Sequence, residues 1–326
     1  MSLLQKFREL NIPTTKNSKL LNALTLDKFP FAKIGVNFEG LPVILIASIA
    51  DRSHLSQKNV RLKYLELTHN LECKVSENNK YEIAFFSVII FKSLQSNLQS
   101  YFLGIAESLL QSLSLSPTQN EVFETFKNFI EIFRALSDNP SKTLQGLWAE
   151  IFLIEKSKNP DVLLNYWHNI PEERFDFNAD IEKLEVKSSS KLERVHIFTS
   201  EQLNPPNDKQ VMIASIFTKQ TSNGRSITDL MESIQMKLLD KTLMDKLYSV
   251  VAKTLGNTVE QSIRIKYDYG LANSSLRFYR HQDISKIEKL YIPDRVSEVK
   301  YKSDLTSTNS VNLETLNDKQ KLFKAL

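Results

Sequence analysis

Two acids and a lysine near the middle of the chain have the types and spacing that phosphodiester hydrolysis needs. The stretch over residues 174–187 reads Arg-Phe-Asp-Phe-Asn-Ala-Asp-Ile-Glu-Lys-Leu-Glu-Val-Lys. It places an acid at Asp176 and an acid-x-lysine motif at Glu185 and Lys187. Carboxylates bind a hard cation such as Mg²⁺ through oxygen, and a lysine supplies a point charge beside a phosphate. The stretch therefore predicts a site for metal-assisted phosphodiester hydrolysis.

Two short strands joined by a tight turn must position these groups. On a strand, Glu185 and Lys187 point to one face. Leu184 and Val186 then point to the other face and anchor the strand in the core. Asp176 precedes the turn, so a hairpin of this length would bring its carboxylate next to that of Glu185.

Two further Glu-x-Lys tripeptides, at residues 72–74 and 298–300, compete with this assignment. The first has no aspartate shortly upstream on a pairing strand. The second follows Asp294, but only three residues separate Asp294 from Glu298, too few for two strands and a turn. Only residues 185–187 combine spacing, turn chemistry and apolar flanks. The alternative for this hairpin is that its charged face serves solvation alone.

A glutamate upstream, Glu150, is an unusual insertion in the mostly apolar stretch 147–154, which has helical spacing. A glutamate near a buried face is seldom left unpaired. Glu150 is therefore a candidate member of the same site. The alternative is that it lies on the wet side of its helix.

These motifs resemble the PD-(D/E)XK phosphodiesterase superfamily, the restriction-endonuclease-like nucleases. More narrowly, the chain resembles bacterial PD-(D/E)XK motif proteins encoded in restriction and phage-defence gene clusters. The similarity covers most of the chain. Its recognisable motifs are at residues 146–150, 175–177, 184–187, 196–197 and 200–206.

The resemblance implies an α/β (α+β) fold with an αβββαβ core, in which helices flank a central mixed sheet. It makes Asp176 and Glu185 ligands of Mg²⁺, for which Mn²⁺ can substitute, with help from the backbone carbonyl of Val186. Lys187 would be the catalytic lysine, and Glu150 would assist the metal site. Phe175 stands where the motif has its proline, a departure that the superfamily tolerates.

The implied activity is that of a metal-dependent DNA endonuclease acting in restriction or phage defence. An alternative is a catalytically silent nuclease-fold subunit that binds DNA or assembles a defence complex. Further partners would be an ATPase or helicase, a methyltransferase, or a second copy in a homodimer. Candidate DNA contacts are Lys191, Arg194, Lys219 and Arg225, any of which could instead be solvated surface. Gln202 could reach the phosphate, or could brace the loop that follows it.

Bulk composition restricts the class of protein without identifying it. The chain has 326 residues, a net charge of +4 and a sequence pI near 8.8, which permits but does not require a polyanionic partner. Its apolar runs are too short to cross a bilayer, so no membrane association is expected. A single cysteine, Cys73, suits a reducing compartment, and we expect a cytoplasmic protein. The five histidines are scattered, which argues against a histidine-rich metal site.

Periodicity divides the chain into four parts. Residues 1–93 are β-rich, 94–140 form connecting helices, 141–303 form the nuclease-like core with its extension, and 304–326 form a polar tail expected to fray. Ser141 is a plausible N-cap for the helix that carries Glu150. Later strands are expected at residues 263–269, 276–280 and 299–301.

Overall fold

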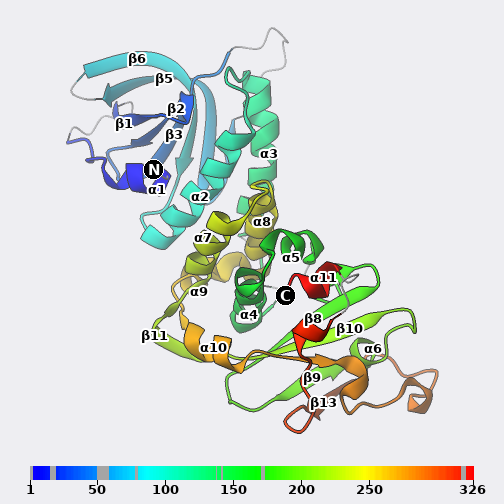
Figure 1. Cartoon of the computed structure of the whole chain (residues 1–326). Helices are drawn as coiled ribbons and strands as arrows, with labels where there is room; N and C mark the ends of the chain where they lie inside the picture. Colours follow the sequence, from blue (N-terminus) through cyan, green and yellow to red (C-terminus); the bar gives the residue numbers. More distant parts are fainter. Residues whose placement is uncertain are drawn as a thin grey trace. The chain divides into compact units, whose positions relative to one another are not determined.

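A computed structural model describes residues 3–14, 20–49, 59–77, 80–136, 138–140, 142–169, 173–316 and 321–326. The chain divides into two compact units, Met1–Asn139 and Pro140–Leu326 (Figure 1). Among the described residues, no helix has both the length and the apolar character needed to cross a membrane.

The first unit is built on a six-stranded sheet whose strands follow the order β1-β2-β3-β6-β5-β4. The sheet closes on itself, because β1 pairs antiparallel with β2 and also parallel with β5. Its interior holds Cys73 among alternate apolar residues of the strands. The strands are β1 (Leu20–Leu26), β2 (Phe29–Val36), β3 (Pro42–Ile46), β4 (Val60–Arg61), β5 (Leu65–Glu77) and β6 (Lys80–Phe91).

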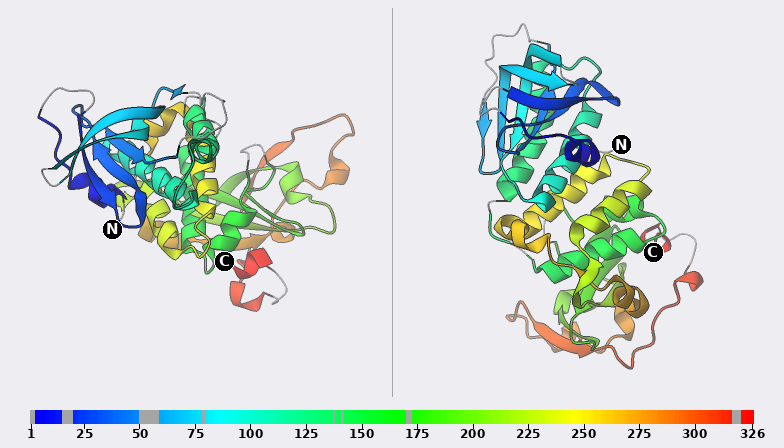
Figure 2. Two further views of the ribbon diagram at one scale, coloured as in Figure 1. Left: turned by 90° about the horizontal axis from the view of Figure 1, so that it is seen from above. Right: turned by 90° about the vertical axis from the view of Figure 1, so that its left-hand side faces the viewer.

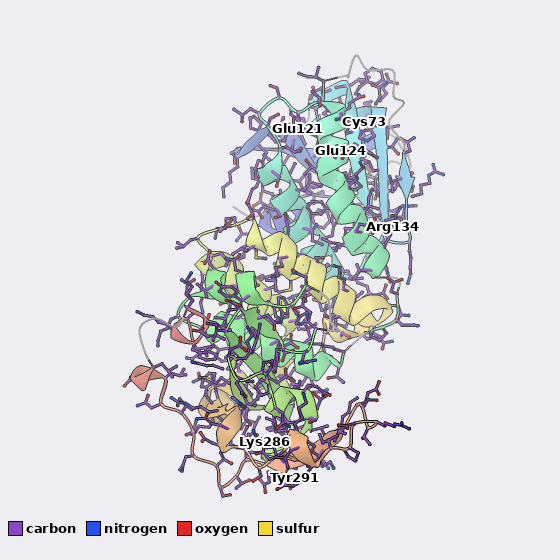
Figure 3. All side chains as sticks on the ribbon, turned by 90° about the vertical axis from the view of Figure 1, so that its right-hand side faces the viewer. Cys73, Glu121, Glu124, Arg134, Lys286 and Tyr291 are labelled. Atoms are coloured by element: carbon purple, nitrogen blue, oxygen red, sulfur yellow. The ribbon has the colours of Figure 1, made fainter. Side chains whose placement is uncertain are left out.

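The helices that accompany this sheet are α1 (Leu3–Arg8), α2 (Ser96–Ser112) and α3 (Gln119–Ala135). The ring of Phe91 on β6 stacks on that of Phe102 on α2 at 4.7 Å between centroids, and Phe133 of α3 packs against both. On the opposite face of α3, Glu124 and Arg134 are exposed (Figure 3). The amphipathic pattern of the helix therefore directs its apolar stripe onto the sheet.

The second unit contains the element order α4–α5–β7–β8–β9–α6–β10, which is the αβββαβ order implied by the resemblance with one short helix, α5, inserted after α4. Its four-stranded sheet has the order β12-β10-β8-β7, with β8 and β10 parallel and the outer pairs antiparallel. This mixed sheet confirms the expected α+β fold class. The strand β9 pairs with β13 instead, in a separate two-stranded ribbon.

The elements of the second unit are α4 (Leu144–Lys156), α5 (Pro160–Tyr166), β7 (Phe177–Ala179), β8 (Glu182–Ser189), β9 (Val195–Thr199), α6 (Ser200–Leu203), β10 (Gln210–Phe217), β11 (Gln220–Arg225), α7 (Ile227–Lys237), α8 (Leu243–Leu255), α9 (Val259–Ser262), α10 (Tyr269–Ser275), β12 (Arg277–Arg280), β13 (Lys300–Asp304) and α11 (Lys321–Lys324).

Helices cover one face of this sheet in two layers (Figures 1 and 2). The first layer contains α4, which packs directly on β8, and the second contains α7 and α8, which pack on α4. The α4 helix is apolar around most of its circumference because both of its sides are covered. Thr143 begins it by accepting a hydrogen bond from the Gly146 N–H at 3.2 Å. The predicted cap, Ser141, lies outside the described residues.

The structure differs from the prediction of a strand in the later part of the chain. Residues 263–269 do not form a continuous strand: Ile263 and Arg264 lie in a turn, Tyr267 makes isolated antiparallel bridges to Gln220 and Arg225, and the side chain of Asp268 caps α10, which begins at Tyr269. Ile263 and Tyr267 are buried, so the apolar pattern reflects their packing in the core. At the end of the polar tail, α11 is docked on β8 through the Glu182 carboxylate, which accepts from the Leu322 N–H at 2.6 Å.

Candidate metal centre

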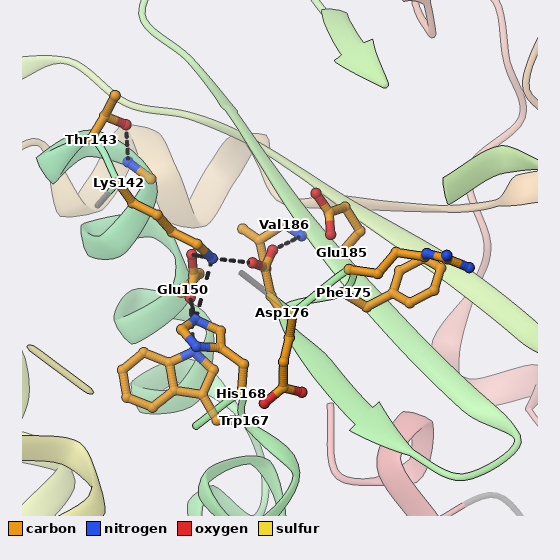
Figure 4. Close-up of polar contacts among 12 residues, drawn as sticks. Lys142, Thr143, Glu150, Trp167, His168, Phe175, Asp176, Glu185 and Val186 are labelled. Carbon is orange, nitrogen blue, oxygen red and sulfur yellow. Dashed lines mark hydrogen bonds and ion pairs between the residues drawn. The ribbon is translucent and has the colours of Figure 1, made fainter. Parts of the chain in front are cut away.

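A two-residue turn between β7 and β8 determines where the first acid lies. Ala179 pairs with Glu182, and Asp180 takes a φ of 49°, a left-handed conformation that aspartate tolerates. Asp176 therefore sits just before the hairpin, and its Oδ2 accepts a hydrogen bond from the Val186 N–H at 2.8 Å (Figure 4). The carboxylate is held against the backbone of the strand that carries the acid-x-lysine motif.

Glu185 and Lys187 share one face of β8, as the alternation of a strand requires. The Lys187 Nζ lies 2.7 Å from the Glu185 Oε1. Gln202 on α6 contacts both, donating from Nε2 to that Oε1 at 2.7 Å and accepting from the lysine at 3.2 Å. The Gln202 Oε1 also accepts from the Thr199 N–H at 3.2 Å, at the start of α6. Gln202 thus both caps its helix and fixes the acid and the lysine.

Glu150 faces the site from α4 and is 3% exposed, which excludes the wet side of its helix. Its Oε2 accepts from the Trp167 Nε1 at 2.8 Å and lies 2.9 Å from the His168 Nε2. The backbone of His168 is tied to the hairpin, because its N–H donates to the Asp176 carbonyl at 2.9 Å. The segment after α5 therefore brings an imidazole into the acidic cluster.

Lys142, just before α4, places its ammonium among these groups (Figure 4). The Nζ lies 2.8 Å from the Asp176 Oδ1, 3.2 Å from the Glu150 Oε1 and 3.3 Å from the His168 Nε2. Two buried carboxylates require a positive partner. In this structure Lys142 is that partner.

The two motif acids differ in their electrostatics. Burial alone would raise the pKa of the Asp176 carboxyl, but the Lys142 ammonium and the Val186 N–H outweigh burial and hold that pKa below its usual range. Burial, and then the negative charge of Asp176, raises the pKa of Glu185 to about 7 in spite of Lys187. A divalent cation between these acids would favour the charged form of both.

The donor set fits a divalent metal ion. Asp176 and Glu185 supply hard oxygen ligands next to the Val186 backbone, which is the ligand class that Mg²⁺ and Mn²⁺ take. Glu150, His168 and Asp176 each offer one ligand atom, and these atoms all lie within 4.8 Å of one another. Asp176 and Glu185 are both buried, and the Asp176 Oδ2 is hydrogen-bonded to the backbone of the residue that follows Glu185.

The predicted nucleic-acid contacts fall into two groups. Lys191 and Lys219 are exposed and could meet a phosphate. Arg194 is engaged internally, because it donates to the Ser215 Oγ at 2.8 Å and to the Ser275 carbonyl. Arg225 is engaged as well.

Arg225 donates to the Asp229 carbonyl at 2.8 Å, lies 3.5 Å from the Glu155 Oε1 and stacks over the Tyr269 ring. Both arginines thus brace the fold of the second unit. A planar guanidinium with several donors suits such bracing, which the sequence pattern alone does not distinguish from phosphate binding.

The competing tripeptides face solvent. On β5, Glu72 and Lys74 are exposed on either side of the buried Cys73. Glu298 and Lys300 are also exposed, and Glu298 adopts a φ of 56° outside any strand. Exposure on this scale suits a solvated surface, whereas Glu185 of the third tripeptide is buried beside Asp176.

Sequence reasoning missed Lys142 and His168. Neither belongs to the motif, and both reach it through the packing of α4 and α5 against the hairpin. One signal was available: a buried Glu150 demands partners, and His168 follows Trp167 in the segment that connects α5 to the motif. A cavity of about 710 Å³ beside the start of β10 is lined by none of the site residues.

Comparisons with known proteins identify one family for the chain. No curated protein matches the chain, and no solved structure matches it. Residues 3–306 match the model of a family described as "Putative PD-(D/E)XK family member, (DUF4420)". The match runs through both compact units and contains every residue of the site. The chain therefore belongs to this PD-(D/E)XK family.

Proposed function

We propose that the protein is a DNA endonuclease that depends on Mg²⁺ or Mn²⁺ and acts in a bacterial restriction or phage-defence system. The observation that carries the proposal is the convergence of two buried acids, Asp176 and Glu185, with the partly buried Lys187. Membership of a PD-(D/E)XK family supports a nuclease-like activity. The identity of the metal, the DNA substrate and the role in defence go beyond family membership and are proposed here.

Each of the three residues is held in a fixed orientation. The Val186 N–H orients the Asp176 carboxylate, and Gln202 orients Glu185 and Lys187 together. Asp176 and Glu185 would bind the cation. A bound Mg²⁺ would supply a nucleophile by lowering the pKa of water and would offset charge on the phosphate.

Lys187 is placed to stabilise negative charge that grows on the phosphate. Its side chain is only 18% exposed, and its Nζ lies 5.2 Å from the centroid of the Phe198 ring. A positive charge in a partly desolvated site acts more strongly than one in water. Because its partner Glu185 would turn toward the cation, the ammonium would be released to meet the scissile phosphate.

DNA is the proposed substrate because the chain carries a net positive charge and two exposed lysines, Lys191 and Lys219, in the loops that follow β8 and β10. Contacts of this kind bind phosphate without reading sequence. We propose that selectivity for particular DNA sites comes from contacts with the bases, from a helicase or methyltransferase partner, or from a second copy of the chain.

The test is cleavage of a supercoiled plasmid by the full chain in Mg²⁺, in Mn²⁺ and in EDTA. The proposal predicts nicking that requires the metal and disappears in Asp176→Asn and Lys187→Ala. A matched control is Lys300→Ala, which alters the exposed tripeptide, and it should cut like the wild type. Equal cutting by wild type and Lys187→Ala would refute the assigned roles.

One observation favours the alternative of a silent, DNA-binding subunit. Lys142 already neutralises Glu150 and Asp176, as it would in a site that needs no metal. That alternative predicts DNA binding without cleavage in any divalent metal. The intact set of Asp176, Glu185 and Lys187 weighs against it.

A further inference from the structure

We propose that the ammonium of Lys142 occupies a second cation position, formed by Glu150, His168 and Asp176, and that a divalent metal with affinity for nitrogen displaces it. The inference deepens the proposed function and rests on it for the role of Asp176. It adds an imidazole ligand and a built-in competitor to the oxygen ligands of the motif.

The spacing of the three ligand atoms matches a single ion. They lie within 4.8 Å of one another. Ligands on opposite sides of an ion with bonds of about 2.1 Å are about 4.2 Å apart. The cluster thus needs to contract only slightly around a metal. All three side chains are buried, so their positions are set by packing.

The chemistry of the ligands selects the class of metal. Carboxylates alone suit Mg²⁺, Ca²⁺ and Mn²⁺, whereas imidazole favours transition metals. Two carboxylates and one imidazole therefore favour Mn²⁺ over Mg²⁺ at this position. The site formed by Asp176 and Glu185 has only oxygen ligands and lacks that preference.

Lys142 stands where the ion would be. Its Nζ contacts one atom of each of the three ligands, at 2.8 Å from Asp176, 3.2 Å from Glu150 and 3.3 Å from His168. An ammonium and a metal ion cannot share that place. The two cations must compete for the same ligands.

The lysine is able to leave. Its side chain is 23% exposed, so part of it already reaches solvent. The α4 helix is capped by Thr143 through the Gly146 N–H and does not depend on the Lys142 side chain. A flexible four-carbon stem can swing the ammonium into water while the backbone stays in place.

The histidine can offer Nε2 to a metal in one of its two neutral tautomers. With the proton on Nε2, the ring donates to the Glu150 Oε2 at 2.9 Å; with the proton on Nδ1, Nε2 accepts from the Lys142 ammonium at 3.3 Å. Coordination requires the second form, in which the metal takes the place of the ammonium, and Nδ1 has no hydrogen-bond partner within the described part of the chain. The Trp167 Nε1 continues to hold the Glu150 Oε2 at 2.8 Å. Glu150 therefore stays in position when the imidazole turns to the metal.

The first test measures Mn²⁺ affinity by calorimetry and by the loss of the free Mn²⁺ EPR signal. Lys142→Met removes the competing charge while keeping most of the length of the side chain. We expect it to bind Mn²⁺ about tenfold more tightly or better than the wild type, because the ion no longer has to displace an ammonium. Lys209→Met, on the same unit but outside the cluster, should leave the affinity unchanged.

The second test looks for the nitrogen ligand directly. Pulsed EPR of the wild type saturated with Mn²⁺ should show coupling to a ¹⁴N nucleus, and His168→Gln should lose it. His196→Gln is the matched control, since His196 is buried but hydrogen-bonds Ser215 at 2.8 Å. It should keep the signal. This measurement needs no change at Lys142, so it decides the matter even if Lys142→Met does not fold.

Two results would overturn the inference: unchanged Mn²⁺ affinity in a folded Lys142→Met protein, or no nitrogen coupling in the saturated wild type. Plasmid cleavage, measured separately, keeps this failure distinct from that of the proposed function. Cleavage without nitrogen coupling would reject only the second cation position. Nitrogen coupling without cleavage in any metal would reject only the nuclease activity.

Discussion

Replacing Gln202 by alanine separates the two tasks that this residue performs. Its amide accepts from the Thr199 N–H at 3.2 Å, which caps α6, and it donates to Glu185 at 2.7 Å while accepting from Lys187 at 3.2 Å. Losing a helix cap costs about 1 kcal/mol, and losing a hydrogen bond to a charged group costs about 1.5–3 kcal/mol. We expect Gln202→Ala to lower the free energy of unfolding by roughly 2–4 kcal/mol.

Cleavage should fall more than stability alone explains. A residue that orients a ligand of a metal is worth about 10- to 100-fold in affinity or activity. The assay is the rate of plasmid nicking in Mn²⁺ at a temperature where circular dichroism shows that the variant is folded. We expect a rate about 10- to 100-fold lower, with partial recovery at higher Mn²⁺, because the cation can re-orient Glu185.

Asn204→Ala is the control for loss of α6 stability. Asn204 donates to the Ser200 carbonyl at 3.0 Å and to the Ile287 carbonyl at 2.9 Å, which places its amide away from Glu185 and Lys187. It should reduce stability but leave the nicking rate of the folded protein near that of the wild type. A folded Gln202→Ala protein that cuts at the wild-type rate would refute the positioning role.

Three further outcomes follow from the structure. Burial opposes ionisation of Glu155, but Lys237 and its other partners lower the pKa of its carboxyl from 4.5 to about 2. The ionised carboxylate should therefore add up to about 3 kcal/mol to the free energy of unfolding above pH 4.5, and this contribution should be lost as the pH falls toward 2. Urea unfolding at a series of pH values should show less of this loss in Glu155→Gln. Gly224→Ala should cost about 1–3 kcal/mol or more in the same assay, because a Cβ there would lie 2.1 Å from the Tyr267 carbonyl oxygen. Replacing both Lys191 and Lys219 by alanine should weaken DNA binding and make it less sensitive to salt. The slope of the logarithm of the binding constant against the logarithm of the salt concentration should become shallower by about one unit for each phosphate that is no longer neutralised. An unchanged salt dependence would exclude both lysines from the interface.

The hairpin was predictable because its information is local. Alternation placed Glu185 and Lys187 on one face of a strand, and the short turn left one position for Asp176. The helix that carries Glu150 could be predicted equally well, from the helical spacing of its apolar residues and from the single acid among them. These features depend on periods of about 2 and 3.6 residues, which a sequence displays directly.

The partners of the acids were not predictable in the same way. Lys142 and His168 meet Asp176 only after α4 and α5 have packed on the sheet, and no spacing rule encodes that contact. Arg194 illustrates the opposite case. Its position beside the motif suggested DNA binding, yet its guanidinium donates hydrogen bonds to Ser215 and Ser275 inside the fold.

The measurement that tests the central claim most directly is diffraction from crystals of the full chain soaked in Mn²⁺, recorded where Mn²⁺ scatters anomalously. We expect an anomalous peak within about 2.2 Å of a carboxylate oxygen of both Asp176 and Glu185, and near the Val186 carbonyl. Saturating Mn²⁺ that leaves no peak between those two carboxylates would contradict it.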